Sequence, residues 1–180
     1  MPGVFVFPGG VTEEQDANVE VSADLNSECL TTMQVANQRE ANALAISALR
    51  ETHEETGLLA GFDTHKTQHT FHQHVAAGNL PDLSKLYYFG RAVTPPVHKY
   101  RFHARFFLLE LESTLPVDRE SDELEDIQWL SLPAPADLPT APVTEFMLEE
   151  CWRRFQNGFS HSDQTPYFRW ENEQRTITWE

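Results

Sequence analysis

One short stretch, Arg50–Leu58, constrains this chain more than any other, because it places three carboxylates ahead of a glycine at the end of an apolar helical run. On a helix Glu51, Glu54 and Glu55 occupy positions i, i+3 and i+4, so they project from one face. Like charges this close repel one another, and a hard divalent cation with oxygen ligands would offset the repulsion. A solvated acidic helix face is the alternative. Arg50 is placed to pair with one carboxylate and fix its orientation.

An apolar run and a Pro-Gly-Gly turn precede this helix. Val4–Phe7 predicts a short buried strand, and residues 8–10 predict a sharp turn. Two adjacent glycines let the main chain approach a ligand closely. Phe-Pro-Gly-Gly followed by Arg-Glu-x-x-Glu-Glu-x-Gly-Leu resembles the signature of the Nudix hydrolases, which cleave diphosphate linkages in nucleoside diphosphate derivatives with magnesium or manganese.

The resemblance implies a fold and a ligand set. The fold is an α+β class, an α/β/α sandwich with a mixed β-sheet between helices. The cofactor is Mg²⁺ or Mn²⁺, held by Glu51, Glu54, Glu55 and the main-chain carbonyl of Gly10. Glu54 is then a catalytic residue, and Arg50 supports catalysis by orienting a carboxylate.

The family signature, called the box below, runs here from Gly10 to Leu58, and its spacing departs from the family pattern. The interval from Gly10 to Arg50 is 26 residues longer than the pattern has, and we place this insertion at about 11–41. Counting forward from Gly10 puts Asp16 where the first glutamate of the box belongs. Counting back from Arg50 puts Asn42 there. Neither is the expected residue, so the sequence leaves that position open.

A long insertion in the box resembles the family branch that includes coenzyme A diphosphatases and bacterial relatives, as do the later segments 90–96 and 101–108. We expect 1–158 to form the Nudix domain and 159–180 to form a C-terminal tail with a β-hairpin. Since Nudix domains carry further residues before Phe-Pro-Gly-Gly, we expect a sheet that lacks the usual N-terminal strands, unless the first methionine is internal to a longer protein.

The general base is sought in a loop before a tryptophan-bearing strand. Glu123 lies six residues before Trp129 and is our candidate for the base or an extra metal ligand, with Glu120 and Glu125 as rivals. A structural partner for an arginine is the other interpretation of Glu123.

Two further groups of side chains carry alternatives. Arg101 and Arg105 are expected on one face of a strand, where they either bind substrate phosphates or pair with surface acids. His65, His69 and His72 fall on one helical face, which suits zinc or simply a solvated helix.

The remaining elements follow from apolar periodicity and turn residues. Glu13, Glu14 and Asp16 are expected on a solvated surface. The second long helix is expected to bury Phe146, Met147, Cys151 and Phe155. The expected helices cover 31–56, 64–77 and 142–156, with Gly57 as a left-handed cap, and the expected strands cover 87–93, 102–111, 127–130, 167–170 and 175–179.

Composition limits the function. A net charge of −15 argues against a nucleic-acid polymer as partner but permits a small nucleotide-derived diphosphate whose charge a metal neutralises. No apolar run is long enough for a membrane span, and two lone cysteines fit a reducing cytoplasm. An unpaired sheet edge would suit a homodimer. Two functions remain, a metal-dependent diphosphatase and a non-catalytic module that binds a nucleotide or a protein.

Overall fold

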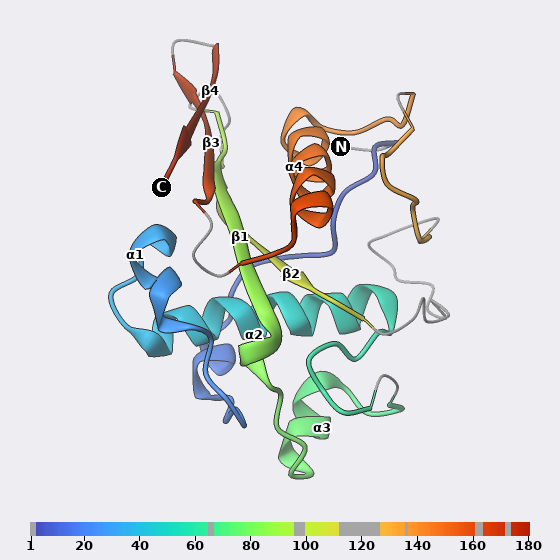
Figure 1. The fold of residues 1–180 in the computed structure, drawn as a ribbon. Coiled ribbons are helices and arrows are strands. Elements are labelled where there is room, and N and C mark those ends of the chain that lie inside the picture. Colours follow the sequence, from blue (N-terminus) through green and yellow to red (C-terminus); the bar gives the residue numbers. More distant parts are fainter. Residues whose placement is uncertain are drawn as a thin grey trace.

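The central feature is a mixed sheet with strand order β2-β1-β3-β4 (Figure 1). β1 (Leu86–Val93) pairs antiparallel with β2 (His103–Leu109) and parallel with β3 (Pro166–Glu171), and β3 pairs antiparallel with β4 (Gln174–Trp179). This confirms the predicted mixed α+β class. The computed structural model describes residues 3–64, 67–95, 100–111, 127–135, 137–160, 164–171 and 174–180.

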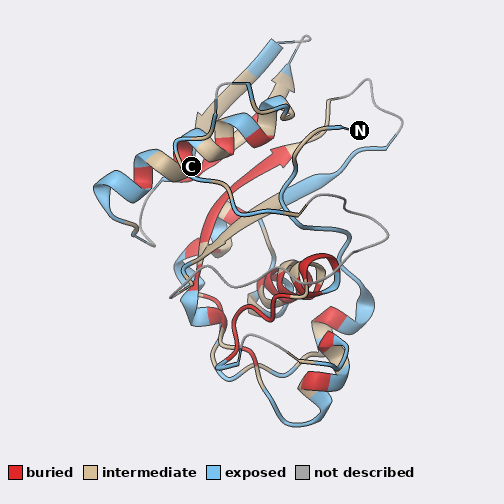
Figure 2. Ribbon diagram, turned by 90° about the vertical axis from the view of Figure 1, so that its right-hand side faces the viewer, coloured by how far each residue is buried: buried red, intermediate tan, exposed pale blue. Residues whose placement is uncertain are grey.

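Helices cover both faces of this sheet. Successive side chains of a strand point to opposite faces, and in β1 a register shift between Tyr88 and Gly90 interrupts this alternation. The strand contributes Leu86 and Tyr88 to one buried cluster and Phe89 and Ala92 to another. The first cluster includes side chains of α2 (Gln38–Thr56), and the second includes side chains of α4 (Pro142–Asn157). Figure 2 shows β1 buried through the middle of the molecule between these layers.

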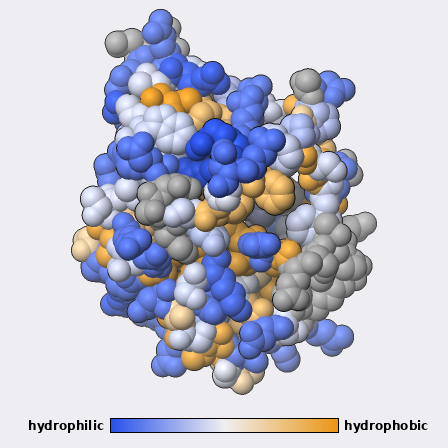
Figure 3. Space-filling view, in the orientation of Figure 1, coloured by the Kyte–Doolittle hydropathy of each residue, from blue (hydrophilic) through white to orange (hydrophobic). Residues whose placement is uncertain are grey.

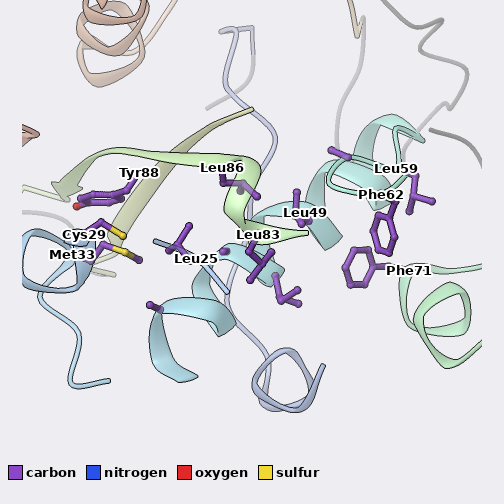
Figure 4. Close-up of a cluster of buried hydrophobic side chains, with 14 residues drawn as sticks. Leu25, Cys29, Met33, Leu49, Leu59, Phe62, Phe71, Leu83, Leu86 and Tyr88 are labelled. Atoms are coloured by element: carbon purple, nitrogen blue, oxygen red, sulfur yellow. The ribbon is translucent and has the colours of Figure 1, made fainter. Parts of the chain in front are cut away.

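The larger cluster lies between α2, the start of β1 and the segments around them (Figure 4). It joins residues that are distant in sequence, so it fixes the loop before α2 as well as the helix itself. Its most buried members are Leu25, Met33, Ala41, Ala45, Ile46, Leu59, Phe71, Leu83 and Leu86.

The long first helix was predicted as one element over 31–56, and this was wrong at its start. α1 (Leu30–Met33) ends because Gln34 adopts a left-handed conformation with φ of 54°. α2 begins after Asn37, whose side chain accepts a hydrogen bond from the Glu40 N–H at 3.0 Å. It ends where predicted, at Gly57 with φ of 74°, a conformation that glycine adopts without strain.

The predicted helix over 64–77 is shorter than expected. Among the described residues only α3 (Phe71–Ala76) is helical there, because a capping box between Thr70 and Gln73 starts the helix. The described ranges also contain three short 3₁₀ helices, namely η1 (Glu14–Asn18), η2 (Ser27–Cys29) and η3 (Leu83–Lys85). No helix in the described ranges is long and apolar enough to cross a membrane.

The predicted buried strand at residues 4–7 does not form. Phe5 makes an isolated parallel bridge to Thr140, and Phe7 is 38% exposed. Pro139 and Pro142 flank the bridge partner and lack N–H groups, so the ladder cannot extend along them. The predicted strand at 127–130 does not form either, and these residues line a cavity together with residues 4–8.

The exposed side of α4 was predicted in part incorrectly. Met147 is fully buried, but Phe155 is 66% exposed and stacks on Trp152 with ring centroids 5.8 Å apart. The buried positions near the helix end are taken instead by Glu150 and Arg154, which form an ion pair at 2.6 Å. A buried ion pair thus stands at the end of α4, where the buried side chain of Phe155 was expected.

Candidate functional site

Arg50 is the centre of the candidate site. Its side chain is 2% exposed, and the guanidinium forms a two-point ion pair with Asp16, with Nε 2.9 Å from Oδ1 and Nη2 3.2 Å from Oδ2. Nη2 also donates to the main-chain oxygen of Val11 at 3.0 Å. The residues that follow the Pro-Gly-Gly turn are therefore fixed onto α2 through one buried side chain.

The same guanidinium contacts two of the three carboxylates of the box. Nη1 of Arg50 donates to Oε1 of Glu51 at 2.9 Å and to Oε2 of Glu54 at 2.8 Å. Both oxygens therefore lie within hydrogen-bond distance of a single nitrogen atom. Glu51 is 12% exposed and Glu54 is 45% exposed, so Glu54 is the carboxylate with more access to solvent.

The two glycines before the insertion lie against the same carboxylates. The N–H of Gly9 donates to Oε2 of Glu55 at 2.9 Å. A Cβ atom on Gly10 would lie 2.8 Å from Oε2 of Glu51 and closer still to Oε1, so only glycine fits while that carboxylate stays in place. The turn and the helix thus bring Gly10, Glu51, Glu54 and Glu55 into one neighbourhood.

The carboxylates around Arg50 favour a positive charge at the candidate site. Burial lowers the pKa of Arg50, but the hydrogen bond and charge of Asp16, with those of Glu51, outweigh it and raise the pKa overall. Arg50 is therefore charged at any working pH, yet it is one cation among four carboxylates, those of Asp16, Glu51, Glu54 and Glu55. Carboxylate and main-chain oxygens are the donors that Mg²⁺ and Mn²⁺ prefer, so the donor set fits such an ion.

The side chains are held by protein contacts in this arrangement. Within the described ranges, no three or more histidine, cysteine, aspartate or glutamate side chains are grouped closely enough to form a ready metal site. Glu51 and Glu54 turn toward Arg50 instead.

Asp16 is the residue of the site that sequence reasoning misjudged. Its acidic surroundings predicted a solvated surface, but its side chain is fully buried against Arg50. The sequence feature that could have identified Asp16 as a site residue was its position six residues after Gly10, where the forward count places the first glutamate of the box. Asn42, the result of the backward count, instead bonds to Asp24 and to the Leu25 N–H.

The two predicted phosphate-binding arginines are not together on a strand. Arg105 lies in β2 and donates to the main-chain oxygens of Met33, at 3.0 and 3.3 Å, and of His103, at 2.8 Å. Arg101 precedes β2 and is exposed. The predicted general base Glu123, with Glu120 and Glu125, lies outside the described residues.

The histidines gather between α2 and α3. Nε2 of His53 lies 3.1 Å from the main-chain oxygen of His69, and His53 and His74 are buried. Burial lowers the pKa of His74, and the charges of His69 and His53 add to that effect. His65, a member of the predicted zinc face, lies outside the described residues.

An apolar cavity of about 430 Å³ adjoins the candidate site. Ala48, Thr52 and Thr56 form one row of α2 along its wall, next to the row of Glu51 and Glu55. Figure 3 shows apolar residues around a hollow on this face of the molecule. Sequence reasoning did not foresee the cavity, because its walls come from segments that a local pattern does not bring together, including residues 4–8, 107–111 and 127–130.

Comparison with known proteins gives a structural match. No family model and no curated protein matches the chain. The crystal structure of a NUDIX hydrolase from Alicyclobacillus acidocaldarius is similar, with a TM-score of 0.64 and 27% sequence identity over 82% of this chain and 75% of that one. The resemblance to the Nudix hydrolases seen in the Arg50–Leu58 stretch is thereby confirmed at the level of the family.

Proposed function

We propose that this protein is a metal-dependent Nudix hydrolase that cleaves a diphosphate linkage in a nucleoside diphosphate derivative. One observation supports the proposal above the others. A single buried arginine, Arg50, contacts Asp16, Glu51 and Glu54, while Gly9 and Gly10 lie against Glu55 and Glu51. The motif residues of the box are thus assembled from two segments that are far apart in sequence.

The ion would be held by Glu51, Glu54, Glu55 and the carbonyl of Gly10. When bound, Mg²⁺ or Mn²⁺ neutralises charge on the diphosphate oxygens and supplies an activated water near neutral pH. The protein's own part is positioning. Arg50 holds two carboxylates at fixed places, and the exposure of Glu54 leaves that side chain free to reach solvent. Glu123 remains our proposal for the general base.

The substrate class is a small nucleotide-derived diphosphate, such as a coenzyme A ester, ADP-ribose or a dinucleotide. Of the two arginines proposed for its phosphates, Arg101 is the better candidate. Arg105 already donates to the carbonyls of Met33 and His103, so binding a phosphate would break bonds that it makes in the folded protein. Arg101 is exposed and carries no such bonds in the described part of the chain.

A second candidate function is a non-catalytic module that binds a nucleotide or a protein. One observation favours it, namely that Glu51 and Glu54 already have a protein cation as partner, in Arg50, without any metal. A structural role would then explain why these carboxylates are present.

The experiment that separates the two is a hydrolysis panel. Coenzyme A, acetyl-coenzyme A, ADP-ribose, NADH and diadenosine polyphosphates are each incubated with magnesium, manganese or EDTA, and an added phosphatase releases phosphate from monophosphate products. Cleavage that needs the metal establishes the hydrolase and identifies its substrate class. Binding of a panel member without cleavage favours the module.

The Glu54→Gln variant links that activity to the proposed residue. Because Glu54 is half exposed, losing its ion pair should change the free energy of unfolding by no more than about 1 kcal/mol. Turnover should fall by more than about 100-fold, the upper end of the effect of removing a residue behind a metal ligand. Glu149→Gln, an exposed acid on α4, is the matched control. Full metal-dependent turnover in Glu54→Gln would show that the assignment is wrong.

A further inference from the structure

His72 has a buried ring nitrogen without a hydrogen-bond partner among the described residues. It is the second residue of α3, and its side chain is 29% exposed overall although Nε2 is covered. The ring contacts that of Phe71, which is fully buried, with centroids 5.6 Å apart. Buried ring nitrogens normally have a partner, so the placement of this nitrogen needs an explanation.

The polar group that Nε2 of His72 faces is the carboxylate of Asp16. Nε2 lies 4.0 Å from Oδ1, which is too long for a hydrogen bond but within ion-pair distance. Oδ1 accepts one bond, from Nε of Arg50 at 2.9 Å, whereas Oδ2 accepts two, from Nη2 of Arg50 and from the Glu13 N–H. A carboxylate oxygen has room for two donors, so within the described residues Oδ1 has an open acceptor position on the side of His72.

Among the three histidines with unpartnered buried nitrogens in this region, His53, His72 and His74, only His72 has a described carboxylate within ion-pair distance. That carboxylate is the one that anchors Arg50, and Arg50 in turn contacts Glu51 and Glu54. A small rotation of the imidazole would therefore satisfy both His72 and Asp16 and connect α3 to the box.

We propose that His72 is a positioning residue for the box: its Nε2–H donates to Oδ1 of Asp16 and thereby holds Arg50, and through Arg50 the carboxylates of Glu51 and Glu54. Its effect on turnover rests on the proposed function, because only a catalytic box converts their placement into a rate. The imidazole itself does not touch substrate. The connection joins α3, η1 and α2, so it ties the His-rich segment to the chemistry without a metal at the histidines.

The kinetic test compares His72→Phe with His72→Gln. Phenylalanine keeps the ring shape and removes the donor, so kcat should fall about tenfold or more, in the range seen when a residue supporting a metal ligand is lost, while KM stays within about twofold. Glutamine retains an N–H donor at similar reach and should restore most of kcat. His69→Gln, a substitution in the loop before α3, is the control and should leave kcat unchanged. Equal kcat values for His72→Phe and wild type would overturn the proposal.

A second readout does not depend on activity. In ¹⁵N-labelled wild-type protein at pH 8, a hydrogen-bonded His72 should show an Nε2–H proton protected from exchange with water, and Asp16→Asn should remove that signal. If wild type hydrolyses nothing, the proposed function fails while this signal still decides the contact. A fast-exchanging Nε2–H in the wild type overturns the proposal. If Asp16→Asn does not fold, the difference in kcat or in stability between His72→Phe and His72→Gln replaces the comparison with that variant.

Discussion

Replacing Gly10 by alanine tests the close approach between the Pro-Gly-Gly turn and the box helix. The new Cβ would lie 2.8 Å from Oε2 of Glu51 and nearer to its other carboxylate atoms, whereas side-chain atoms pack at about 3.5–4.0 Å. The carboxylate would have to move by about 1 Å. It cannot do so freely, since it is 12% exposed and bonded to Arg50. We expect overpacking to lower the free energy of unfolding by about 1–3 kcal/mol.

The displacement should also reduce catalysis. A misplacement of about 1 Å in a catalytic constellation costs on the order of 100-fold in rate, so kcat/KM of Gly10→Ala should fall by about that factor. Gly9→Ala is the matched control, because a Cβ there meets nothing within 4 Å and the N–H that binds Glu55 is kept. Its stability should stay within about 0.5 kcal/mol of wild type. Urea unfolding and phosphate release measure both variants, and equal values for Gly10→Ala and Gly9→Ala would refute the reasoning.

Three more predictions concern buried or bonded side chains. Asp16→Asn should lower the free energy of unfolding by about 1.5–3 kcal/mol, since it removes the charge of the carboxylate that pairs at two points with the buried Arg50 while Glu51 and Glu54 still contact the guanidinium. In the same urea titration, Glu14→Gln on the exposed side of η1 should change the free energy of unfolding by less than about 0.5 kcal/mol. Burial lowers the pKa of His74, so below pH 6.5 the unfolded chain binds more protons than the folded protein, and the stability contributed by neutral His74 is lost as the pH falls toward the lowered pKa. Between pH 7.5 and 5.5 the free energy of unfolding should therefore fall more in wild type than in His74→Phe. Equal losses in the two proteins would contradict this. Arg105→Ala should reduce stability by about 1.5–3 kcal/mol, because it removes charged hydrogen bonds to main-chain carbonyls, while KM stays within about twofold; a large rise in KM would restore Arg105 as a phosphate ligand.

The sequence predicted correctly those helices and strands whose formation depends on residues close together in the chain. The apolar runs of β1 and β2 and the stripe of α2 were readable because burial on one or both faces imposes a period, and Gly57 was readable because a left-handed cap favours glycine. The break between α1 and α2 was not, because Gln34 adopts a conformation that its residue type does not announce. Phe5 failed as a strand for a tertiary reason, since its partner segment contains prolines.

The candidate site shows the same division. The order of Arg50, Glu51, Glu54 and Glu55 along the chain was enough to place them on one helix. The sequence left open which residue stands at the first glutamate position of the box, because the insertion made the forward and backward counts disagree. It also did not predict the contact of Asp16 with Arg50, since the two residues are 34 positions apart along the chain.

The measurement that tests the proposed metal site most directly is a Mn²⁺ titration followed by electron paramagnetic resonance. Wild type, Glu54→Gln and Glu149→Gln are compared, the last controlling for diffuse binding to a protein of net charge −15. We predict that wild type and Glu149→Gln bind one ion with equal affinity and that Glu54→Gln binds it at least about tenfold more weakly. Equal Mn²⁺ affinity in all three proteins would contradict the assignment of the box as the metal site.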